Sequence, residues 1–493
     1  MRAPYIVLCG IVFFFFQCLA ATAQSWSIGS SVSGVSSLTI IDGLMVKQKS
    51  GLRGIQREAE HGDGEARVVS GVSYDRLRLM AEQGNAYAQT VLGEKHASGD
   101  GAFQDDGEAV EWFRKAAEQG YARAQHNLGY MYAIGQGVDQ DNGKAVEWFR
   151  KAAEQGYAHA QHNLGYMYAT GQGVVQDDAK AVEWYRKAAE QEVDSAQNSL
   201  GVMYWAGRGV VQGDASRAME LYRQAAEQRY ARAQFNLGNM YAQGRGVDWD
   251  DSEAVEWFRQ AAEQGDARAQ HSLGYMYANG RGVDRDDGKA VEWFQKAAEQ
   301  GYARAQFGMG YMYTNGRGVA QDDGKAAEWN RKAAEQGYAR AQFNLGVMYA
   351  NGKGVVQDDA KAAEWFQKAA EQGYARAQFN LGVMYEDGNG VVRDNRKAVE
   401  WYQKAAEQGY ARAQFNLGMM YANGKGIIRD NRRAARWFRQ AAEQGDAGAQ
   451  FRLGMLYELG RGVARDSGKA MEWYRKAAEQ GDADAEQRLG LID

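Results

Sequence analysis

A motif that returns about every 36 residues constrains this chain more than any other feature. The pattern A-Q-x-x-L-G-x-M-Y starts at Ala88, and the spacing between copies is 36 residues except for 37 after Ala196. The first Ala of each copy is at Ala88, Ala124, Ala160, Ala196, Ala233, Ala269, Ala305, Ala341, Ala377, Ala413, Ala449 and Ala485. Eleven full units are therefore expected over 88–484, with a half repeat at 71–87 and a truncated repeat at 485–493.

Each unit has the apolar periodicity of two short helices. In the unit that starts at Ala341, the apolar residues of 341–349 fall on one helical stripe, and Gly352 is placed to end that helix. Asp358 or Asp359 can cap a second helix, which Gly373 closes. The second stripe consists of Ala362, Trp365, Phe366, Ala369 and Ala370.

Two helices with one apolar stripe each cannot bury themselves, so the units have to stack on one another. This predicts an all-α fold, a right-handed solenoid superhelix of tandem helix-turn-helix repeats. The recurring Trp of the second stripe is expected to be the largest core contributor, so Trp365→Ala is expected to cost about 3–5 kcal/mol. Gly346 lies inside a helix, where a close helix approach would compensate its poor propensity.

The N-terminus reads as a targeting segment. Arg2 precedes an apolar run that ends at Cys18, and the triplet 21–23 (Ala-Thr-Ala) fits a cleavage site, so residues 1–23 are predicted to be a signal peptide. An uncleaved anchor is the alternative, although the run is shorter than the roughly 20 residues that span a bilayer. Residues 24–70 are expected to be a flexible linker and degenerate region. The protein is therefore expected in the periplasm or outside the cell.

Composition limits the kinds of partner and chemistry. Lys and Arg number 58 against 63 Asp and Glu, without a long like-charged block, which argues against nucleic acid and against an anionic membrane surface. Both cysteines, Cys9 and Cys18, fall in the expected signal peptide, so the mature chain would have no disulfide and no Cys nucleophile. No cofactor and no stable membrane insertion after signal cleavage are expected.

The motif L-G-x-M-Y-x-x-G-x-G-V followed by K-A-x-E-W-F-x-K-A-A-E-Q-G resembles the Sel-one-like repeat (SLR) family, over about four-fifths of the chain. That family is related to tetratricopeptide repeats and has a similar two-helix solenoid. The resemblance implies an adaptor, as in membrane-protein degradation complexes, signalling scaffolds and bacterial factors that contact host proteins. A branch clamped by disulfides is associated with penicillin binding and hydrolysis, which a chain without mature Cys does not inherit.

The candidate binding residues lie on the first helix of the units. An Asn recurs at its fourth residue counted from the motif Ala, and in tetratricopeptide-like solenoids this helix lines the concave face. A carboxamide offers both a donor and an acceptor to the backbone of an extended peptide. The Asn ladder is Asn127, Asn163, Asn236, Asn344, Asn380 and Asn416.

Arginines beside this ladder could contact acidic segments, and phenylalanines could supply apolar anchors. These residues are Arg340, Arg376, Arg412, Phe343, Phe379 and Phe415. Because the units are close to identical, duplication alone could also have copied Asn and Arg without any binding role. Both interpretations stay open from the sequence.

Histidines give a second, weaker candidate. His159 and His162 lie one helical turn apart, and His126 occupies the same repeat position as His162, so the three could hold Zn²⁺ or Cu²⁺. The alternative is that His replaces the Phe found there in other units. No metal site is the preferred prediction.

The sequence thus predicts an exported scaffold, not an enzyme, that binds a protein or an extended peptide through its concave face. A role as a host-contact or virulence factor is one form that this function could take. An envelope enzyme acting on cell-wall material or β-lactams is one rival. A structural spacer without a specific ligand is the other.

Overall fold

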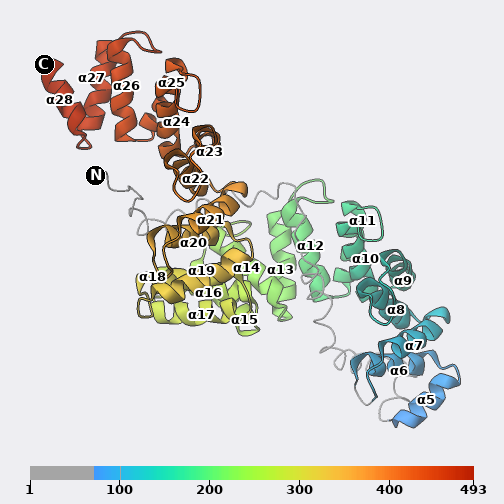
Figure 1. Ribbon diagram of the computed structural model, residues 1–493. Coiled ribbons are helices and arrows are strands. Elements are labelled where there is room, and N and C mark those ends of the chain that lie inside the picture. The colour runs from blue at the N-terminus through green and yellow to red at the C-terminus, as the bar shows by residue number, and fades with distance from the viewer. Residues whose placement is uncertain (1–71, 100–101, 493) are drawn as a thin grey trace. The chain divides into compact units, whose positions relative to one another are not determined.

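The computed structural model describes residues 72–99 and 102–492, and within these ranges it contains 24 α-helices and no strand (Figure 1). The all-α prediction is confirmed. The expected signal peptide at 1–23 and the linker at 24–70 lie outside the described residues. Among the residues described, no helix is both long enough and apolar enough to cross a membrane.

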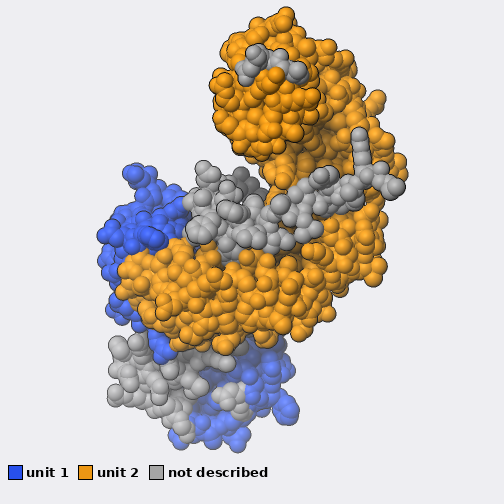
Figure 2. Space-filling view, turned by 90° about the vertical axis from the view of Figure 1, so that its left-hand side faces the viewer, with its two compact units in different colours: residues 1–249 blue, residues 250–493 orange. Residues whose placement is uncertain are grey.

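The chain divides into two compact units, residues 1–249 and 250–493, which Figure 2 colours separately. The helices of the first unit are α5 (Tyr74–Glu82), α6 (Ala86–Ser98), α7 (Asp106–Glu118), α8 (Ala122–Ile134), α9 (Asn142–Glu154), α10 (Ala158–Thr170), α11 (Asp178–Glu190), α12 (Asp194–Ala206), α13 (Ala215–Glu227) and α14 (Ala231–Gln243).

The second unit continues the same alternation of helices. It consists of α15 (Asp251–Glu263), α16 (Ala267–Asn279), α17 (Asp287–Glu299), α18 (Ala303–Asn315), α19 (Asp323–Glu335), α20 (Ala339–Asn351), α21 (Asp359–Glu371), α22 (Ala375–Asp387), α23 (Asn395–Glu407), α24 (Ala411–Asn423), α25 (Asn431–Glu443), α26 (Ala447–Leu459), α27 (Ser467–Ala478) and α28 (Ala483–Ile492). Within each unit, every helix packs mainly against the helix before it and the helix after it, which is the expected solenoid.

The helix ends form as the capping residues predict. Gly352 follows α20 with φ of 65°, a left-handed conformation that a residue with a Cβ rarely adopts. Asp358 precedes α21, and its side chain accepts a hydrogen bond of 3.0 Å from the amide of Lys361. That hydrogen bond lowers the pKa of Asp358. Asp141 before α9 and Asp286 before α17 cap their helices in the same way.

The core differs from the prediction in one respect. Phe366, the residue after the recurring Trp, is only 3% exposed, whereas Trp365 is half-buried. One face of the Trp365 indole is covered by the Lys368 ammonium, 4.0 Å from the ring centre. Trp112, at 7% exposed, is the one Trp of this position that is buried. The prediction that Trp is the largest core contributor is therefore wrong, because the second stripe turns its Phe or Tyr inward and leaves Trp at its margin.

The glycine inside the first helix is explained by this aromatic ring. A Cβ placed on Gly346 would lie 2.7 Å from ring carbons of Phe366, closer than side chains pack. The same holds for Gly382 against Tyr402 and Gly418 against Phe438. The close approach of the two helices of a unit, expected from the sequence, thus takes place against the buried aromatic residue.

A ladder of glutamines, which was not predicted from the sequence, joins the two helices of a repeat unit to each other and to the preceding unit. Gln342 in α20 is 4% exposed, and its Nε2 donates to the backbone oxygen of Ala334 at 3.1 Å. Its Oε1 accepts from Gln372 Nε2, at the end of the second helix of the same repeat unit, at 2.7 Å. Equivalent bonds join Gln119 to Gln89, Gln155 to Gln125, Gln300 to Gln270, Gln336 to Gln306, Gln408 to Gln378, Gln444 to Gln414 and Gln480 to Gln450.

Candidate functional site

The first helices of the units carry the candidate site, and one place in the chain shows how its residues work. Counting from the first residue of each of these helices, Arg123 is at position 2 and Asn127 at position 6 of α8. Glu94 is at position 9 of α6, the first helix of the preceding unit. These three residues meet across the boundary between two neighbouring repeat units.

Glu94 is bound by both side chains at once. The Arg123 guanidinium donates from Nε and from Nη2 to the two carboxylate oxygens, each at 2.8 Å. Asn127 Nδ2 donates to Oε1 at 3.0 Å. A bidentate arginine is the strongest geometry for a carboxylate, and the amide fixes its orientation. We call the residues at positions 2 and 6 the Arg–Asn clamp, and here the clamp holds a carboxylate.

Other members of the Asn ladder also reach back toward the preceding unit. Asn163 Nδ2 lies 3.0 Å from His126 Nε2, and Asn236 Nδ2 donates to Asn198 Oδ1 at 2.9 Å. His126 and Asn198 both occupy position 5 of their helices. The amide at position 6 therefore uses a polar acceptor of the preceding unit at each of these places.

Three consecutive clamps, all in the compact unit 250–493, have different surroundings. They are Arg340 with Asn344, Arg376 with Asn380, and Arg412 with Asn416. In all three cases the first helix of the preceding repeat unit has Phe at position 5 and Tyr or Val at position 9. These neighbours are Phe307 and Tyr311, Phe343 and Val347, and Phe379 and Val383. Of the eleven first helices α6 to α26, only α6 has an acidic residue at position 9.

These three clamps therefore have no carboxylate from the neighbouring first helix. Asn344, Asn380 and Asn416 are half-buried, so each side chain has one part packed and another in contact with solvent. Arg412 is exposed, and the Arg376 guanidinium lies 5.3 Å from the centre of the Phe343 ring. The Arg and Asn residues that bind Glu94 in the compact unit 1–249 are thus repeated at places where position 9 of the preceding first helix is not acidic.

The phenylalanines next to the ladder serve mainly in packing. Phe343 is 9% exposed and contacts the rings of Phe366 and Tyr374, at centroid distances of 5.7 and 5.3 Å. Phe379 and Phe415 are half-buried and pack in the same way, Phe379 on Tyr402 and Phe415 on Phe438. These rings pack beside the clamps and leave little ring surface exposed for a ligand.

Two of the candidate metal-ligating histidines are hydrogen-bonded within the fold. His126 Nδ1 is hydrogen-bonded to Asn127 Oδ1 at 3.2 Å, and its Nε2 is bonded to Asn163, so both ring nitrogens are engaged. His162 Nε2 is bonded to Ser199 Oγ at 3.2 Å. Across residues 72–99 and 102–492, no three His, Cys, Asp or Glu side chains are grouped to hold an ion. The alternative of a metal site at His126, His159 and His162 is not supported.

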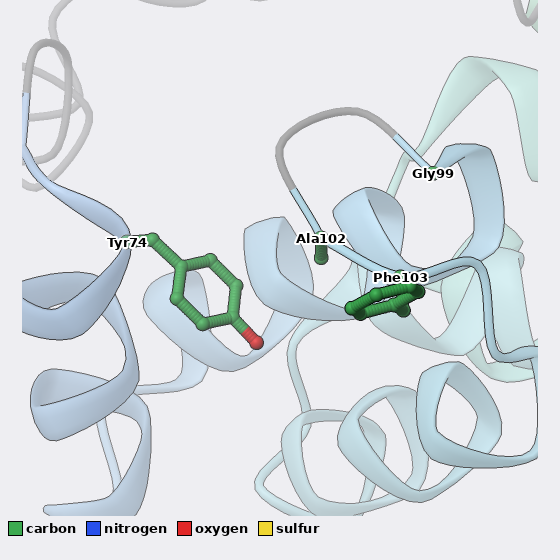
Figure 3. Close-up of a pocket in the computed structure, with 4 residues that line it drawn as sticks. All are labelled: Tyr74, Gly99, Ala102 and Phe103. Carbon is green, nitrogen blue, oxygen red and sulfur yellow. The ribbon is translucent and has the colours of Figure 1, made fainter.

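A cleft of about 480 Å³ lies near the start of the described chain, lined by Tyr74, Gly99, Ala102 and Phe103 (Figure 3). The Tyr74 hydroxyl is 3.1 Å from His96 Nε2, and His96 Nδ1 is 3.2 Å from the Phe103 carbonyl oxygen. Since both nitrogens of the buried imidazole are bonded within the fold, this cluster links α5, α6 and the following loop. It supplies no activated nucleophile.

Comparison with known proteins identifies the repeat. The Sel1 repeat model matches eleven consecutive segments that run without a break from 86 to 482, in a frame starting two residues before Ala88. One segment, 194–230, contains the 37-residue unit. No curated protein sequence matches the chain.

Two solved structures are similar over most of the chain. One is c5321, described as a protective antigen of uropathogenic Escherichia coli strains with an SLR fold, at 42% identity and a TM-score of 0.66, covering 85% of this chain and 90% of that one. The other is a Sel1 repeat protein from Oxalobacter formigenes, at 34% identity and a TM-score of 0.48, covering 74% and 93%. The chain therefore belongs to the Sel1 repeat family.

Proposed function

We propose that this protein is an exported scaffold that binds acidic, extended segments of a partner protein. The binding residues are the Arg–Asn clamps of the compact unit 250–493. The clamps are Arg340 with Asn344, Arg376 with Asn380, and Arg412 with Asn416. In this role the chain is a binding protein and not an enzyme, and the partner lies along the concave face that the first helices are expected to line.

One observation carries the proposal. Where a neighbouring unit supplies a carboxylate, at Glu94, an arginine at position 2 and an asparagine at position 6 bind it with three hydrogen bonds. Hydrogen bonds between charged groups contribute about 1.5–3 kcal/mol each when they are shielded from water. Three adjacent clamps can therefore bind a segment with several Asp or Glu residues, and a single carboxylate would bind weakly.

Membership of the Sel1 repeat family supports a role in protein–protein interaction. The similarity to c5321 supports export and host contact, because a protective antigen has to be accessible to the host. The apolar segment before Ala23 supports export independently.

The experiment measures the binding of a fluorescent peptide rich in Asp and Glu, with an Asn- and Gln-substituted peptide as the neutral control. We expect the acidic peptide to bind and the neutral peptide to bind far more weakly. Changing Arg412→Gln together with Asn416→Ala should weaken binding about tenfold, since about 1.4 kcal/mol corresponds to a factor of ten. Removing all three clamps should abolish binding.

The matched control changes the filled clamp, Arg123→Gln with Asn127→Ala. Because Glu94 already occupies this clamp, the substitution should lower the stability of the first unit and leave peptide affinity unchanged. If both clamp variants weaken binding equally, or if neither does, the clamps are not the peptide site. Binding by no acidic peptide at all would favour the structural spacer, and turnover of a cell-wall or β-lactam substrate would favour the enzyme.

A further inference from the structure

A cluster of exposed arginines on the second unit departs from the repeat and defines a separate surface. We name it the basic edge, formed by Arg393, Arg396, Arg429, Arg432 and Arg436, all of them exposed. We propose that the basic edge, with the aliphatic residues beside it, binds the anionic lipid surface of a membrane peripherally.

Because the repeat units are nearly identical, a residue that differs from its equivalents in the other repeats is easily recognised. The second helices of the repeats are the eleven odd-numbered helices from α7 to α27. At their second residue, nine of them have Gly, Ala or Ser, whereas α23 has Arg396 and α25 has Arg432. At the sixth residue, ten have Glu and α25 alone has Arg436. Arginine at these two positions is therefore confined to two neighbouring repeat units.

The local charge is strongly positive although that of the whole chain is not. Residues 388–439 contain eleven Lys and Arg and four Asp and Glu, in a chain whose net charge is −5. Two of the four acids are N-caps: Asp394 accepts from the amide of Arg396 at 2.9 Å, and Asp430 accepts from that of Arg432 at 2.9 Å. Glu400 and Glu407 are on α23. No ion pair of the described residues involves the Arg429, Arg432 or Arg436 side chains. The whole-chain balance thus conceals a basic surface.

Aliphatic side chains project beside these arginines. Val356, Val392 and Ile428 are each 88% exposed, at the same place in three successive loops between first and second helices. The second and third of these loops pack closely on the start of the preceding second helix, because a Cβ added to Gly390 would overlap the carbonyl oxygen of Asp359 in α21, and one added to Gly426 would overlap that of Asn395 in α23. The three side chains therefore project at equivalent places along one edge of the compact unit 250–493.

This combination fits a bilayer better than another macromolecule. Exposed aliphatic residues on projecting loops can enter the boundary between headgroups and acyl chains while arginines beside them contact lipid phosphates. A single-stranded nucleic acid would favour aromatic residues on which bases stack, and the projecting residues here are Val and Ile. A protein partner would favour a hollow, whereas these side chains protrude from loop tips.

The basic edge and the clamps can be used at the same time. Arg412 and Asn416 lie at the start of α24, and the loop that carries Ile428 and Arg429 follows the end of that helix. A helix of 13 residues is about 20 Å long, so the two surfaces lie at opposite ends of the first helices. Membrane attachment would leave the peptide surface open.

The test is co-sedimentation of the full chain with vesicles of phosphatidylcholine alone and of phosphatidylcholine with phosphatidylglycerol. We expect binding only to the anionic vesicles, weakened by salt. Each arginine near an anionic surface strengthens binding about fivefold, so Arg429→Gln, Arg432→Gln and Arg436→Gln together should weaken it about a hundredfold. Val392→Ser with Ile428→Ser should weaken it about tenfold, without loss of folding, because both side chains are exposed.

The matched control removes three positive charges elsewhere on second helices, by Lys144→Gln, Lys289→Gln and Lys325→Gln. All variants retain residues 1–71, so a contribution from that segment is the same in each. Equal binding to both vesicle types, no binding to anionic vesicles, or equal weakening in the control would overturn the proposal. Binding of polyglutamate or duplex DNA through the same arginines, in place of vesicles, would assign the surface to another class of partner and would also overturn it.

Discussion

Two adjacent aromatic residues of α21 provide a direct test of how the units are packed. Phe366 is 3% exposed and fills the space against Gly346, whereas Trp365 is half-buried under Lys368. Size alone would make the Trp the more important residue. The structure predicts the opposite order for Phe366→Ala and Trp365→Ala.

The magnitudes follow from burial. Truncation of a fully buried Phe leaves a cavity and costs about 3–5 kcal/mol. Trp365→Ala loses roughly half of a buried indole surface and an exposed cation–π contact of about 0.5–1 kcal/mol, so we expect about 1–2 kcal/mol. The variants should thus differ by about 2 kcal/mol.

The assay has to report locally, because a long repeat array need not unfold in one step. Hydrogen exchange of the amides in α20, α21 and α22 measures the opening free energy of this unit, and urea unfolding followed by circular dichroism gives the change for the array. A larger loss for Trp365→Ala than for Phe366→Ala would refute this account of the core.

Three further outcomes follow from named contacts. Glu94→Gln removes the charge held by Arg123, so hydrogen exchange should show the α6–α8 contact weakened by about 1–2 kcal/mol, and an unchanged exchange rate would contradict the geometry of the filled clamp. Gln342→Leu leaves a donor of Gln372 without its partner and should cost about 1–3 kcal/mol in urea unfolding, whereas the exposed Gln403→Leu should be nearly neutral; equal effects would argue against the glutamine ladder. Burial, with a smaller effect of Arg304, lowers the pKa of His271 to about 3. Between about pH 6.5 and pH 3 the His271 imidazole is protonated in the unfolded chain but not in the folded chain. The free energy of unfolding therefore decreases as the pH is lowered through this range. His271→Phe should reduce that fall in thermal melts, and parallel melting of both proteins across this range would contradict the assignment.

The sequence was sufficient for the architecture because periodicity, caps and repeat length all depend on local residue patterns. The helix ends at Gly352 and Asp358 are found where the capping residues predict them. Which of two adjacent aromatic residues faces inward was not predictable, since Trp365 and Phe366 both fall within a broad apolar stripe and only the packed neighbour decides between them.

The glutamine ladder and the filled clamp were missed for a related reason. A Gln follows the motif Ala in all eleven full copies, so its recurrence was visible. The partner of Gln342, Gln372, is 30 residues away and is brought near only when the two helices of the unit pack together. Likewise, Glu94 lies 29 residues before Arg123. A single Glu at a position that elsewhere is Tyr, Val, Met or Asn was the available signal. The sequence identified the Asn and Arg ladders, and the fold supplied the chemistry that they favour.

The central claim is that the Arg–Asn clamps bind carboxylates of a partner. The most direct measurement is a crystal structure of the chain with an acidic peptide. We expect peptide carboxylates at Arg340 and Asn344, at Arg376 and Asn380, and at Arg412 and Asn416, each held as Arg123 and Asn127 hold Glu94. A peptide bound along the second helices, or bound along the first helices through its backbone with its carboxylates in solvent, would contradict it.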